Sequence, residues 1–538
     1  ALATALFLML SVFVPISNAD QPNSVTVSTL EELIAIGNNL SGNYVLEDNI
    51  VVPENCEFAP LGSVSKPFTG NFDGNGYSII NLSLTVEEGD SAYLGLFASN
   101  AGTVSNLNLV NVSANLGSHK YVYLGSIAAI NKASGKIFNC YVSGDVAVSE
   151  CGTYARVGGI AGINRGLIKD TVSEAGINYK AACYVDIGGI VGDNTGSIVA
   201  CENRGPVSAS TTPENYTDEM KDARDSAKVY AGGIVGFSEG SADAPASIAK
   251  CINSGSVYAD SYNDLLVGGI LGHSYSSSVY SVEISINTGK VSSKSRDGFI
   301  TVSTGAVAGS AYGTFTDCAY LTDSYTTAGG GVEAEVKTVD ELRAMAEGIT
   351  EWYLPTEGTP AVAAHKVISE IELTGMAADD KYPCGTEPQL TVSVKYNDGT
   401  FDNTAKLLIT KGDNKITYAY KTATKEYSYT VEHTFDREVK EEKYLKEPEE
   451  PATCTTPAVY WKSCVCGLAS DTETFEGDTL PHTYDKEIVS NDTLKSAATC
   501  ASPAVYYKSC KCGEISKTET FTFGEKDAAN HTGGTEVV

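Results

Sequence analysis

The 538-residue sequence lacks the motifs that mark several common enzyme classes. It has only 6 histidines, and it contains no His-Glu-x-x-His, no Gly-x-Ser-x-Gly and no P-loop. The spacing of apolar residues that is typical of amphipathic helices is absent from residues 91 to 321. These absences argue against a zinc peptidase of that type, a hydrolase with a nucleophilic serine turn and a phosphate-cradling loop.

Positive charge is also scarce. Lys and Arg number 37 against 67 Asp and Glu, which gives a net charge of −30. Such a surface repels phosphate backbones and anionic lipids, so we expect no nucleic-acid partner. The chain is too long for one ordinary core, and we expect three or four structural units.

A long hydrophobic run occurs only at the start. Residues 1 to 16 are almost uninterruptedly apolar, and Ser17-Asn18-Ala19 supplies the small residues that a signal peptidase reads. We predict a truncated signal peptide at residues 1–19 and no transmembrane segment after it. The mature protein is therefore expected to be secreted, extracellular or held at the cell surface.

Glycine is abundant, with 52 residues, and much of it belongs to one repeat. The clearest copy is Val157-Gly158-Gly159-Ile160-Ala161-Gly162-Ile163-Asn164, and related copies begin at residues 124, 187, 231 and 267. Looser copies near residues 95 and 305 bring the array to about seven turns. Each unit contains three short apolar stretches and no helical pattern, so the sequence predicts a mainly β protein built on a right-handed parallel β-helix.

Two sets of residues recur at one register of the repeat and predict ladders inside the solenoid. The first set is small and comprises Cys140, Cys201, Cys251 and Cys318, with Thr171 and Ser285 in other coils. Stacked thiols at strand spacing point the same way, which favours burial over bonding. The second set is Asn131, Asn164 and Asn194, whose amides are expected to bond along the stack.

The repeat resembles the GLUG motif of bacterial surface proteins, and residues 20–90 resemble the cap that starts such arrays. The resemblance covers about residues 25 to 321 and implies a scaffold. Some proteins with this repeat are metallopeptidases, but the missing His-Glu-x-x-His does not carry that activity over. We expect GLUG coils over 91–321, a capped helix from Ser28-Thr29 and a second one from Thr338 within a cap or linker at 322–366.

Residues 367–432 change to alternating apolar and polar stretches, with a turn at Asn397-Asp398-Gly399-Thr400. This segment resembles a bacterial immunoglobulin-like module and predicts a small antiparallel β-sandwich. Its tyrosines form the one dense aromatic cluster that we recognise, and in a two-layer fold they can alternate into the core. They are Tyr418, Tyr420, Tyr427 and Tyr429.

From residue 433 the chain repeats with a period of 49 residues. We assign one unit to 433–481, a second to 482–530 and the beginning of a further one to 531–538, and we expect the sequence to be cut at both ends. The units resemble the Cys/His repeats of clostridial surface proteins. Each complete unit contains three cysteines in the pattern Cys-x9-Cys-x-Cys-Gly, followed by a histidine.

Three thiols and an imidazole are the ligands of a closed, structural zinc site. The favoured sets are Cys454, Cys464 and Cys466 with His482, and Cys500, Cys510 and Cys512 with His531. The same cysteines could instead use the preceding histidines, His433 and His482. Disulfides or mixed pairing and plain buried thiols remain open, because export favours oxidation.

Together these features predict a non-enzymatic, exported surface protein, an elongated monomer that acts as an adhesin or scaffold. Its expected partners are host or microbial glycans or surface proteins. One alternative is a carbohydrate-active β-helix enzyme, for which Asp186, Asp193 and Glu239 are the candidate carboxylates. The other is a purely structural stalk for a domain further along the protein.

Overall fold

The computed structural model describes residues 24–54, 56–86, 89–116, 119–149, 151–181, 183–211, 227–295, 301–330, 332–447 and 452–530. Contacts divide the chain into two compact units. The first unit comprises residues 1–374, 391–412 and 416–427, and the second comprises 375–390, 413–415 and 428–538. The predicted signal peptide at 1–19 and the final segment 531–538, which contains His531, lie outside the described residues.

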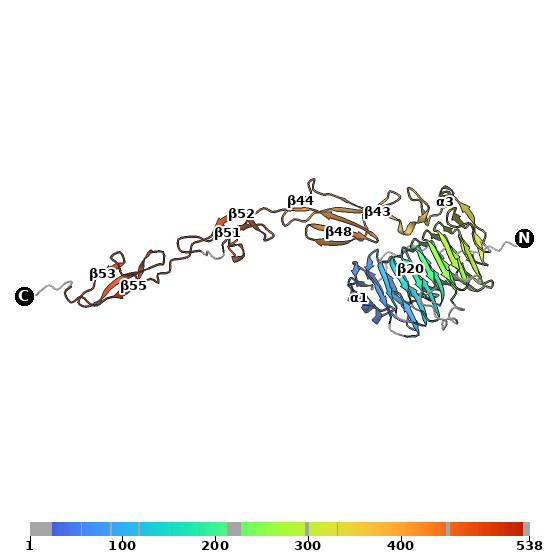
Figure 1. Ribbon diagram of the computed structural model, residues 1–538, viewed down its shortest axis with the longest axis horizontal. Helices are drawn as coiled ribbons and strands as arrows, with labels where there is room; N and C mark the ends of the chain where they lie inside the picture. Colours follow the sequence, from blue (N-terminus) through green and yellow to red (C-terminus); the bar gives the residue numbers. More distant parts are fainter. Residues whose placement is uncertain are drawn as a thin grey trace, which may run out of the picture. The chain divides into compact units, whose positions relative to one another are not determined.

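The first unit is built on a parallel β-solenoid of about 7 turns, as predicted, followed by small antiparallel sheets (Figure 1). A complete coil passes through four parallel sheets rather than three apolar strands. The extra strand arises at the Gly-Gly-Ile motif, where the chain bends after Gly158 and resumes at Ala161. The motif therefore forms a corner between two strands and is not a single strand.

The two sheets on either side of this corner have seven strands each. Sheet D contains β8 (Ser91–Leu94), β12 (Tyr121–Gly125), β16 (Tyr154–Gly158), β21 (Tyr184–Gly188), β26 (Val229–Gly232), β31 (Leu265–Gly268) and β36 (Val302–Gly305). Sheet C contains β9 (Phe97–Asn100), β13 (Ala128–Asn131), β17 (Ala161–Asn164), β22 (Val191–Asn194), β27 (Val235–Ser238), β32 (Leu271–His273) and β37 (Ala308–Ser310).

The other two sheets are longer because the N-terminal segment adds strands to them, and because several coils contribute two strands each to sheet B. Sheet A contains β1 (Val25–Val27), β2 (Asn43–Leu46), β5 (Asn71–Asp73), β10 (Thr103–Ser105), β14 (Lys136–Phe138), β18 (Leu167–Lys169), β23 (Ser197–Val199), β28 (Ala246–Ala249), β33 (Tyr280–Glu283) and β38 (Thr314–Thr316). Sheet B contains β3 (Ile50–Val51), β4 (Glu57–Phe58), β6 (Ser78–Ile80), β7 (Ser83–Thr85), β11 (Asn108–Asn115), β15 (Tyr141–Val148), β19 (Val172–Ser173), β20 (Gly176–Lys180), β24 (Glu202–Asn203), β25 (Val207–Ser210), β29 (Ile252–Asn253), β30 (Val257–Ser261), β34 (Ile286–Asn287), β35 (Val291–Ser295), β39 (Ala319–Leu321) and β40 (Glu335–Lys337).

Both predicted ladders are present inside the solenoid. Cys140, Cys201, Cys251 and Cys318 are all buried. Burial raises the pKa of the Cys140 thiol to about 12, so this cysteine is a protonated packing group. The amide ladder is also buried: Nδ2 of Asn131 donates to Oδ1 of Asn164 at 2.8 Å, and Nδ2 of Asn164 donates to Oδ1 of Asn194 at 2.8 Å.

The second glycine of the motif is required by the neighbouring coil. A Cβ placed on Gly189 would lie 2.3 Å from the carbonyl oxygen of Gly233 and 2.2 Å from Cγ of Asn203. Backbone cannot yield as a flexible side chain can, so any larger residue would push the coils apart. This close approach explains why Gly-Gly recurs at the corner.

Two capped helices flank the coils. Helix α1 (Leu30–Ala35), continued by the 3₁₀ turn η2 (Ile36–Asn38), has the predicted capping box between Thr29 and Glu32. Helix α3 (Val339–Ala346) has Thr338 as its N-cap, in a capping box with Glu341. Its Leu342 packs in one cluster with Trp352 and with residues of successive sheet B strands, so α3 lies against the flank of that sheet.

The short elements that follow are mostly antiparallel. They are β41 (Trp352–Tyr353), β42 (Ala361–Val362), η4 (Ala363–His365), β43 (Ile368–Thr374), β44 (Lys381–Pro383), β45 (Thr391–Tyr396), β46 (Phe401–Asp402), β47 (Leu408–Gly412), β48 (Lys415–Tyr420), β49 (Ala423–Ser428) and β50 (Thr430–Glu432). Strands β43, β45 and β46 form one sheet, and β47, β48 and β49 form another. Tyr418 and Tyr427 are buried between neighbours, whereas Tyr420 and Tyr429 are half-buried.

The second unit contains the Cys/His repeats. Its elements are η5 (Glu442–Tyr444), β51 (Val459–Ser463), β52 (Ala469–Glu476), β53 (Leu494–Ser496), β54 (Ala504–Ser509) and β55 (Ile515–Phe523). Each repeat is organised by one antiparallel hairpin, β51–β52 or β54–β55. Within the described part of the chain, no helix has the length and apolar character needed to cross a membrane.

Replacing Asn164 with Ala tests the amide ladder. The change leaves the amide groups of Asn131 and Asn194 buried with one fewer partner each, so the free energy of unfolding should fall by about 1–3 kcal/mol. Urea unfolding followed through Trp352 in a Trp461→Phe background measures it. The exposed Asn115→Ala is the control, and equal stability of the two variants would contradict a stabilising ladder.

Candidate metal centres and a buried carboxylate pair

The Cys-x-Cys-Gly segment of each repeat forms the turn of its hairpin. In the first repeat, the amide of Cys464 donates to the Leu468 carbonyl at 2.9 Å and the amide of Gly467 donates to the Cys464 carbonyl at 3.0 Å. Gly467 has φ of 90°, a left-handed conformation that glycine adopts without strain. The turn therefore presents both thiols of the motif on one side.

The first cluster comprises Cys384, His433, Cys464 and Cys466, whose donor atoms all lie within 4.8 Å of one another. Sγ of Cys464 is 3.0 Å from Sγ of Cys384 and 2.6 Å from Sγ of Cys466. Nδ1 of His433 is 3.2 Å from Sγ of Cys464. All four residues belong to the second unit.

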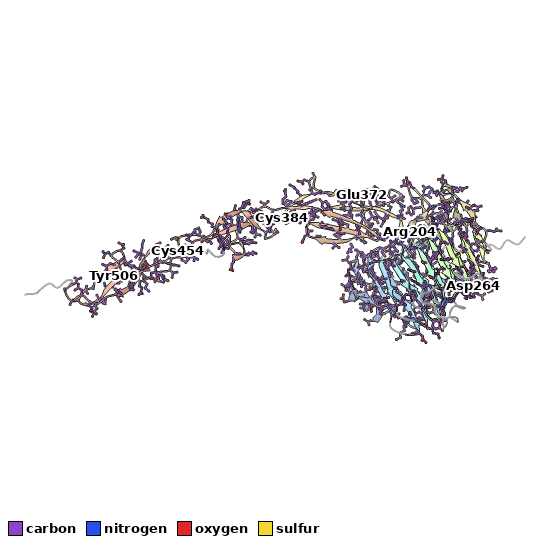
Figure 2. The ribbon with its side chains drawn as sticks, in the orientation of Figure 1. Arg204, Asp264, Glu372, Cys384, Cys454 and Tyr506 are labelled. Carbon is purple, nitrogen blue, oxygen red and sulfur yellow. A yellow bond between two sulfur atoms is a disulfide. The ribbon has the colours of Figure 1, made fainter. Side chains whose placement is uncertain are left out.

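The second cluster repeats this arrangement with Cys454, His482, Cys510 and Cys512. Sγ of Cys454 lies 3.2 Å from Sγ of Cys510, and Nδ1 of His482 lies 3.3 Å from Sγ of Cys512. Nε2 of His482 is 2.8 Å from a carboxylate oxygen of Glu514, a contact that orients the ring. Figure 2 labels Cys384 and Cys454, which hold equivalent places in the two clusters.

These clusters are assembled differently from the predicted sets. In each cluster, the Cys-x-Cys pair lies with the preceding histidine, which was the alternative left open. The third thiol of the cluster comes from the preceding module. Cys454 therefore joins Cys510 and Cys512 rather than Cys464 and Cys466. Exposed Cys500 joins neither cluster, and its predicted partner His531 lies outside the described residues.

Cys384 was missed because we searched within the 49-residue period. The order along the chain could have revealed it, since both clusters read Cys, His, Cys-x-Cys. The isolated cysteine of the 367–432 segment occupies the first place in that order. Its separation from the other donors hides it from any search based on spacing.

The donor sets fit a four-coordinate soft or borderline metal ion. Burial opposes ionisation of Cys464, but hydrogen bonds from Cys384, Cys466 and His433 outweigh it and lower the pKa of this thiol to about 6. A backbone hydrogen bond from Cys512, with further ones from His482 and Cys454, lowers the pKa of Cys510 to about 6. Three sulfurs and one imidazole nitrogen are a zinc ligand set, and they would leave no open position for a substrate.

A disulfide joins Cys151 and Cys183 in the loops that precede β16 and β21. No role was predicted for these two cysteines. Because they lie at equivalent places in consecutive coils, 32 residues apart, the bond staples one coil to the next. Among the described cysteines, the chain thus contains a disulfide, a buried thiol ladder and two clustered sets.

On sheets D and C, the candidate carboxylates Asp186 and Asp193 do converge. Nε of Arg156 is 3.4 Å from Oδ2 of Asp186 and 2.9 Å from Oδ2 of Asp193. The hydroxyl of Tyr184 donates to Oδ1 of Asp186 at 2.7 Å. Glu239, the third candidate, is exposed and makes no ion pair with Arg156.

Burial dominates the electrostatics of this pair. It raises the pKa of Asp186 to about 8, with a further increase from the charge of Asp193, while Arg156 acts in the opposite direction. Burial also raises the pKa of Asp193. Two carboxyl groups with one guanidinium can hold a proton and a negative charge side by side, a difference in protonation state that paired catalytic carboxylates also use.

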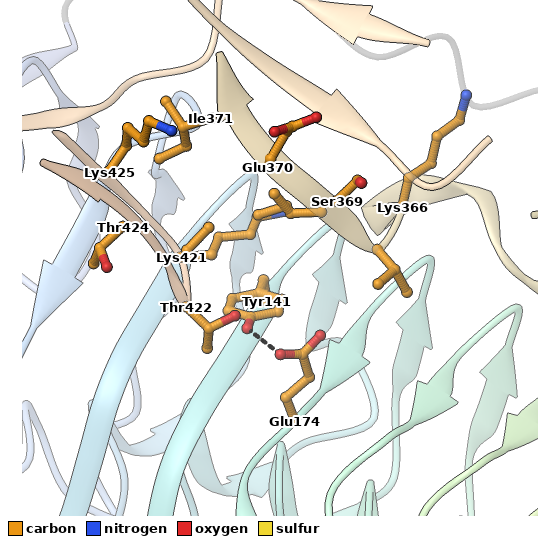
Figure 3. A pocket seen from close by; sticks show the side chains of 13 residues that line it. Tyr141, Glu174, Lys366, Ser369, Glu370, Ile371, Lys421, Thr422, Thr424 and Lys425 are labelled. Carbon is orange, nitrogen blue, oxygen red and sulfur yellow. Dashed lines mark hydrogen bonds between the residues drawn. The ribbon is translucent and has the colours of Figure 1, made fainter. Parts of the chain in front are cut away.

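A cavity of about 450 Å³ lies where the chain after residue 366 meets sheet B (Figure 3). The Tyr141 hydroxyl donates to Glu174 at 2.6 Å, and Glu174 also pairs with Arg204 at 3.0 Å. Buried Lys421 places Nζ 2.8 Å from Nδ1 of His365, and burial followed by the charge of Arg204 lowers the pKa of Lys421 to about 7. The Arg204 guanidinium also donates to the His365 carbonyl at 2.6 Å, and this bond connects the solenoid to the segment that follows it within the first unit.

Comparisons with known proteins show limited similarity. No protein-family model matches the sequence, so the GLUG assignment stays a resemblance. A stretch of 116 residues is 35% identical to halomucin from Haloquadratum walsbyi, covering 20% of this chain. The match spans about 1% of the length of that protein.

Two of the solved structures that match illustrate the low similarity. One is a Bacteroides ovatus protein provisionally assigned as an immunoglobulin A1 protease, with 20% identity, a TM-score of 0.42, and coverage of 64% of this chain and 93% of that one. The other is an IgA1 protease with 14% identity and a TM-score of 0.37, covering 74% of this chain and 34% of that one. Both matched proteins are named as proteases, which contradicts the prediction that the chain is not an enzyme, and that prediction is withdrawn. The names describe those proteins, and no activity is transferred from them.

The raised pKa of Asp186 predicts a pH-dependent stability. In the folded state this carboxyl keeps a proton that the unfolded chain has released, so its contribution to stability falls as the pH rises from the ordinary value of 3.8 to about 8. Urea unfolding of Asp186→Asn between pH 5 and 8, followed through Trp352 in the Trp461→Phe background, should show a smaller decline than the unsubstituted chain. The exposed Asp145→Asn should retain the decline, and equal slopes in all three proteins would refute the effect.

The grouping of the clusters can be tested with paired substitutions. Cys454→Ser with Cys510→Ser removes ligands from one cluster, whereas Cys454→Ser with Cys464→Ser removes one from each. After loading with zinc and dialysis, the first pair should lose one ion and the second pair both. If the first pair instead lost both ions and the second pair lost one, each ligand set would be confined to a single repeat, as first predicted.

Proposed function

We propose that this chain is an exported surface protein that displays its solenoid for contact with glycans or proteins, and that Zn²⁺ ties its C-terminal modules together. The observation that carries the proposal is the origin of the donors. Each cluster takes one thiol from one module and a histidine with two thiols from the next. A metal ion bound there would join neighbouring modules end to end.

The chemistry of the donors supports a structural ion. With four protein ligands, zinc has no position for water and adds folding energy instead of reactivity. Small modules of this kind bury little apolar surface and commonly depend on a metal or on disulfides. The large hydrophobic residues of the second unit include exposed Val465, Leu468 and Phe523, which agrees with such a dependence.

Three observations support export and display. The apolar start followed by Ser17-Asn18-Ala19 has the form of a signal peptide. The disulfide between Cys151 and Cys183 suits an oxidising compartment. The similarity to halomucin also favours a surface protein.

A carbohydrate-active solenoid enzyme is a second candidate, favoured by the convergence of Asp186 and Asp193 on Arg156. Complete burial of Asp186 weighs against it, because a proton donor must reach its substrate. Incubating the full chain with immobilised, labelled polysaccharides separates the two roles. Retained protein without released label supports display, and release that Asp193→Asn abolishes supports catalysis.

Zinc removal tests the clamp. The purified chain should bind two zinc ions, and a chelator should increase hydrogen exchange over β51–β52 and β54–β55 while the solenoid strand β17 stays protected. Cys464→Ser should reduce the content to one ion. Cys500→Ser is the matched control and should retain both, because Cys500 lies outside the two clusters. A chain without zinc, or hairpins indifferent to the chelator, would overturn the clamp.

A further inference from the structure

A second cavity, of about 580 Å³, lies in the first unit between turns of the solenoid and the strands that follow residue 366. Its volume is within the range of pockets that hold small ligands. One wall is formed by asparagines of the solenoid. The opposite wall is formed by residues of β45, β46 and β48, among them two tyrosines.

The solenoid wall presents amides in successive coils. Asn75, Asn106 and Asn139 have φ of 50°, 52° and 51°, so each occupies a left-handed turn. Nδ2 of Asn139 donates to Oδ1 of Asn106 at 2.7 Å, and Nδ2 of Asn106 donates to Oδ1 of Asp73 at 2.9 Å. An amide has two N–H groups and an oxygen with two lone pairs, so these bonds leave donors and acceptors for a ligand.

The facing wall presents rings and one carboxylate. Tyr396 and Tyr420 line the cavity, and both are half-buried. Asp402 accepts bonds from Thr404 at 2.8 and 2.7 Å through Oδ1, while the Tyr396 hydroxyl reaches Oδ2 only at 3.4 Å. This oxygen can accept a stronger bond from a hydroxyl.

The two lysines in the cavity lining already have partners. Nζ of Lys366 contacts Asp398 at 2.5 Å. Nζ of Lys421 lies 2.8 Å from His365, and burial lowers the pKa of both groups. An anionic ligand would therefore find no unpartnered lysine in the lining, which disfavours an acidic sugar and agrees with a neutral one.

We infer that this cavity binds a neutral saccharide. The amides of Asn75, Asn106 and Asn139 and the carboxylate of Asp402 bond its hydroxyls, and the rings of Tyr396 and Tyr420 cover its apolar face. Adjacent hydroxyls on one side and C–H groups on the other are the features of a sugar ring that match such walls. The inference rests on the proposed display role and assigns it a site and a ligand class.

Saturation-transfer NMR on the full chain tests the site with glucose, galactose, mannose, N-acetylglucosamine, lactose, maltose and cellobiose. At least one sugar should receive saturation, and its affinity should fall about tenfold or more in Tyr420→Ala and in Asn139→Gly, about 1.4 kcal/mol. Glycine is chosen at 139 because it keeps the left-handed turn.

Two controls match these variants. Asn111→Gly removes an exposed amide from another left-handed turn, and Phe523→Ala removes an exposed ring from the second unit. Both should bind as the unsubstituted chain does. Absence of transfer to every sugar, or unchanged affinity in Tyr420→Ala and Asn139→Gly, would overturn the inference. Zinc content measured on the same samples reports separately on the metal clamp.

Discussion

The parallel register of the coils is the constraint on which the first unit depends. Each strand pairs with its equivalent in the next coil, about 4.8 Å away, so a side chain meets the residue at the same position one repeat later. Amides at one position can bond to each other, and thiols at another can pack. Charges of one sign could not stack in this way. The column Tyr123, Arg156, Asp186 and Tyr230 shows the solution, because opposite charges occupy adjacent coils and aromatic rings flank them.

Register also explains which parts of the fold were predictable. Repetition reveals positions, and position in a solenoid determines burial, so the cysteine and asparagine ladders could be predicted from the sequence alone. The number of sheets could not, because a bend within Gly-Gly-Ile depends on how closely one backbone approaches the next. A further amide ladder at Asn203, Asn253 and Asn287 was missed because uneven loops hide its period.

The candidate sites were predictable to different degrees. Residue types identified the Cys/His donors, but sequence periodicity assigned them to the wrong neighbours, since a hairpin turn and a residue from the preceding module meet only in three dimensions. Asp186 and Asp193 were found by their repeat register. Arg156 was not found, because it occupies the position that Tyr123 holds in the previous coil and so departs from the repeat pattern.

Local geometry gives the described cysteines different chemistry. In the coil interior, burial keeps the thiol protonated, whereas at the hairpin turns nearby donors favour the thiolate. In the loops before β16 and β21, two sulfurs lie close enough to bond. One chain can thus combine inert, oxidised and ligand cysteines without conflict, because the fold keeps the three kinds apart.

The division of each Cys/His cluster between modules has a consequence for fragments. An excised repeat carries His482, Cys510 and Cys512 but not the thiol that completes the set. Such a piece would have an incomplete coordination shell, and a cysteine from another molecule could fill it. Fragments of this protein would then associate through shared metal ions, in the manner of a domain-swapped oligomer, whereas the intact chain satisfies the same ligands internally.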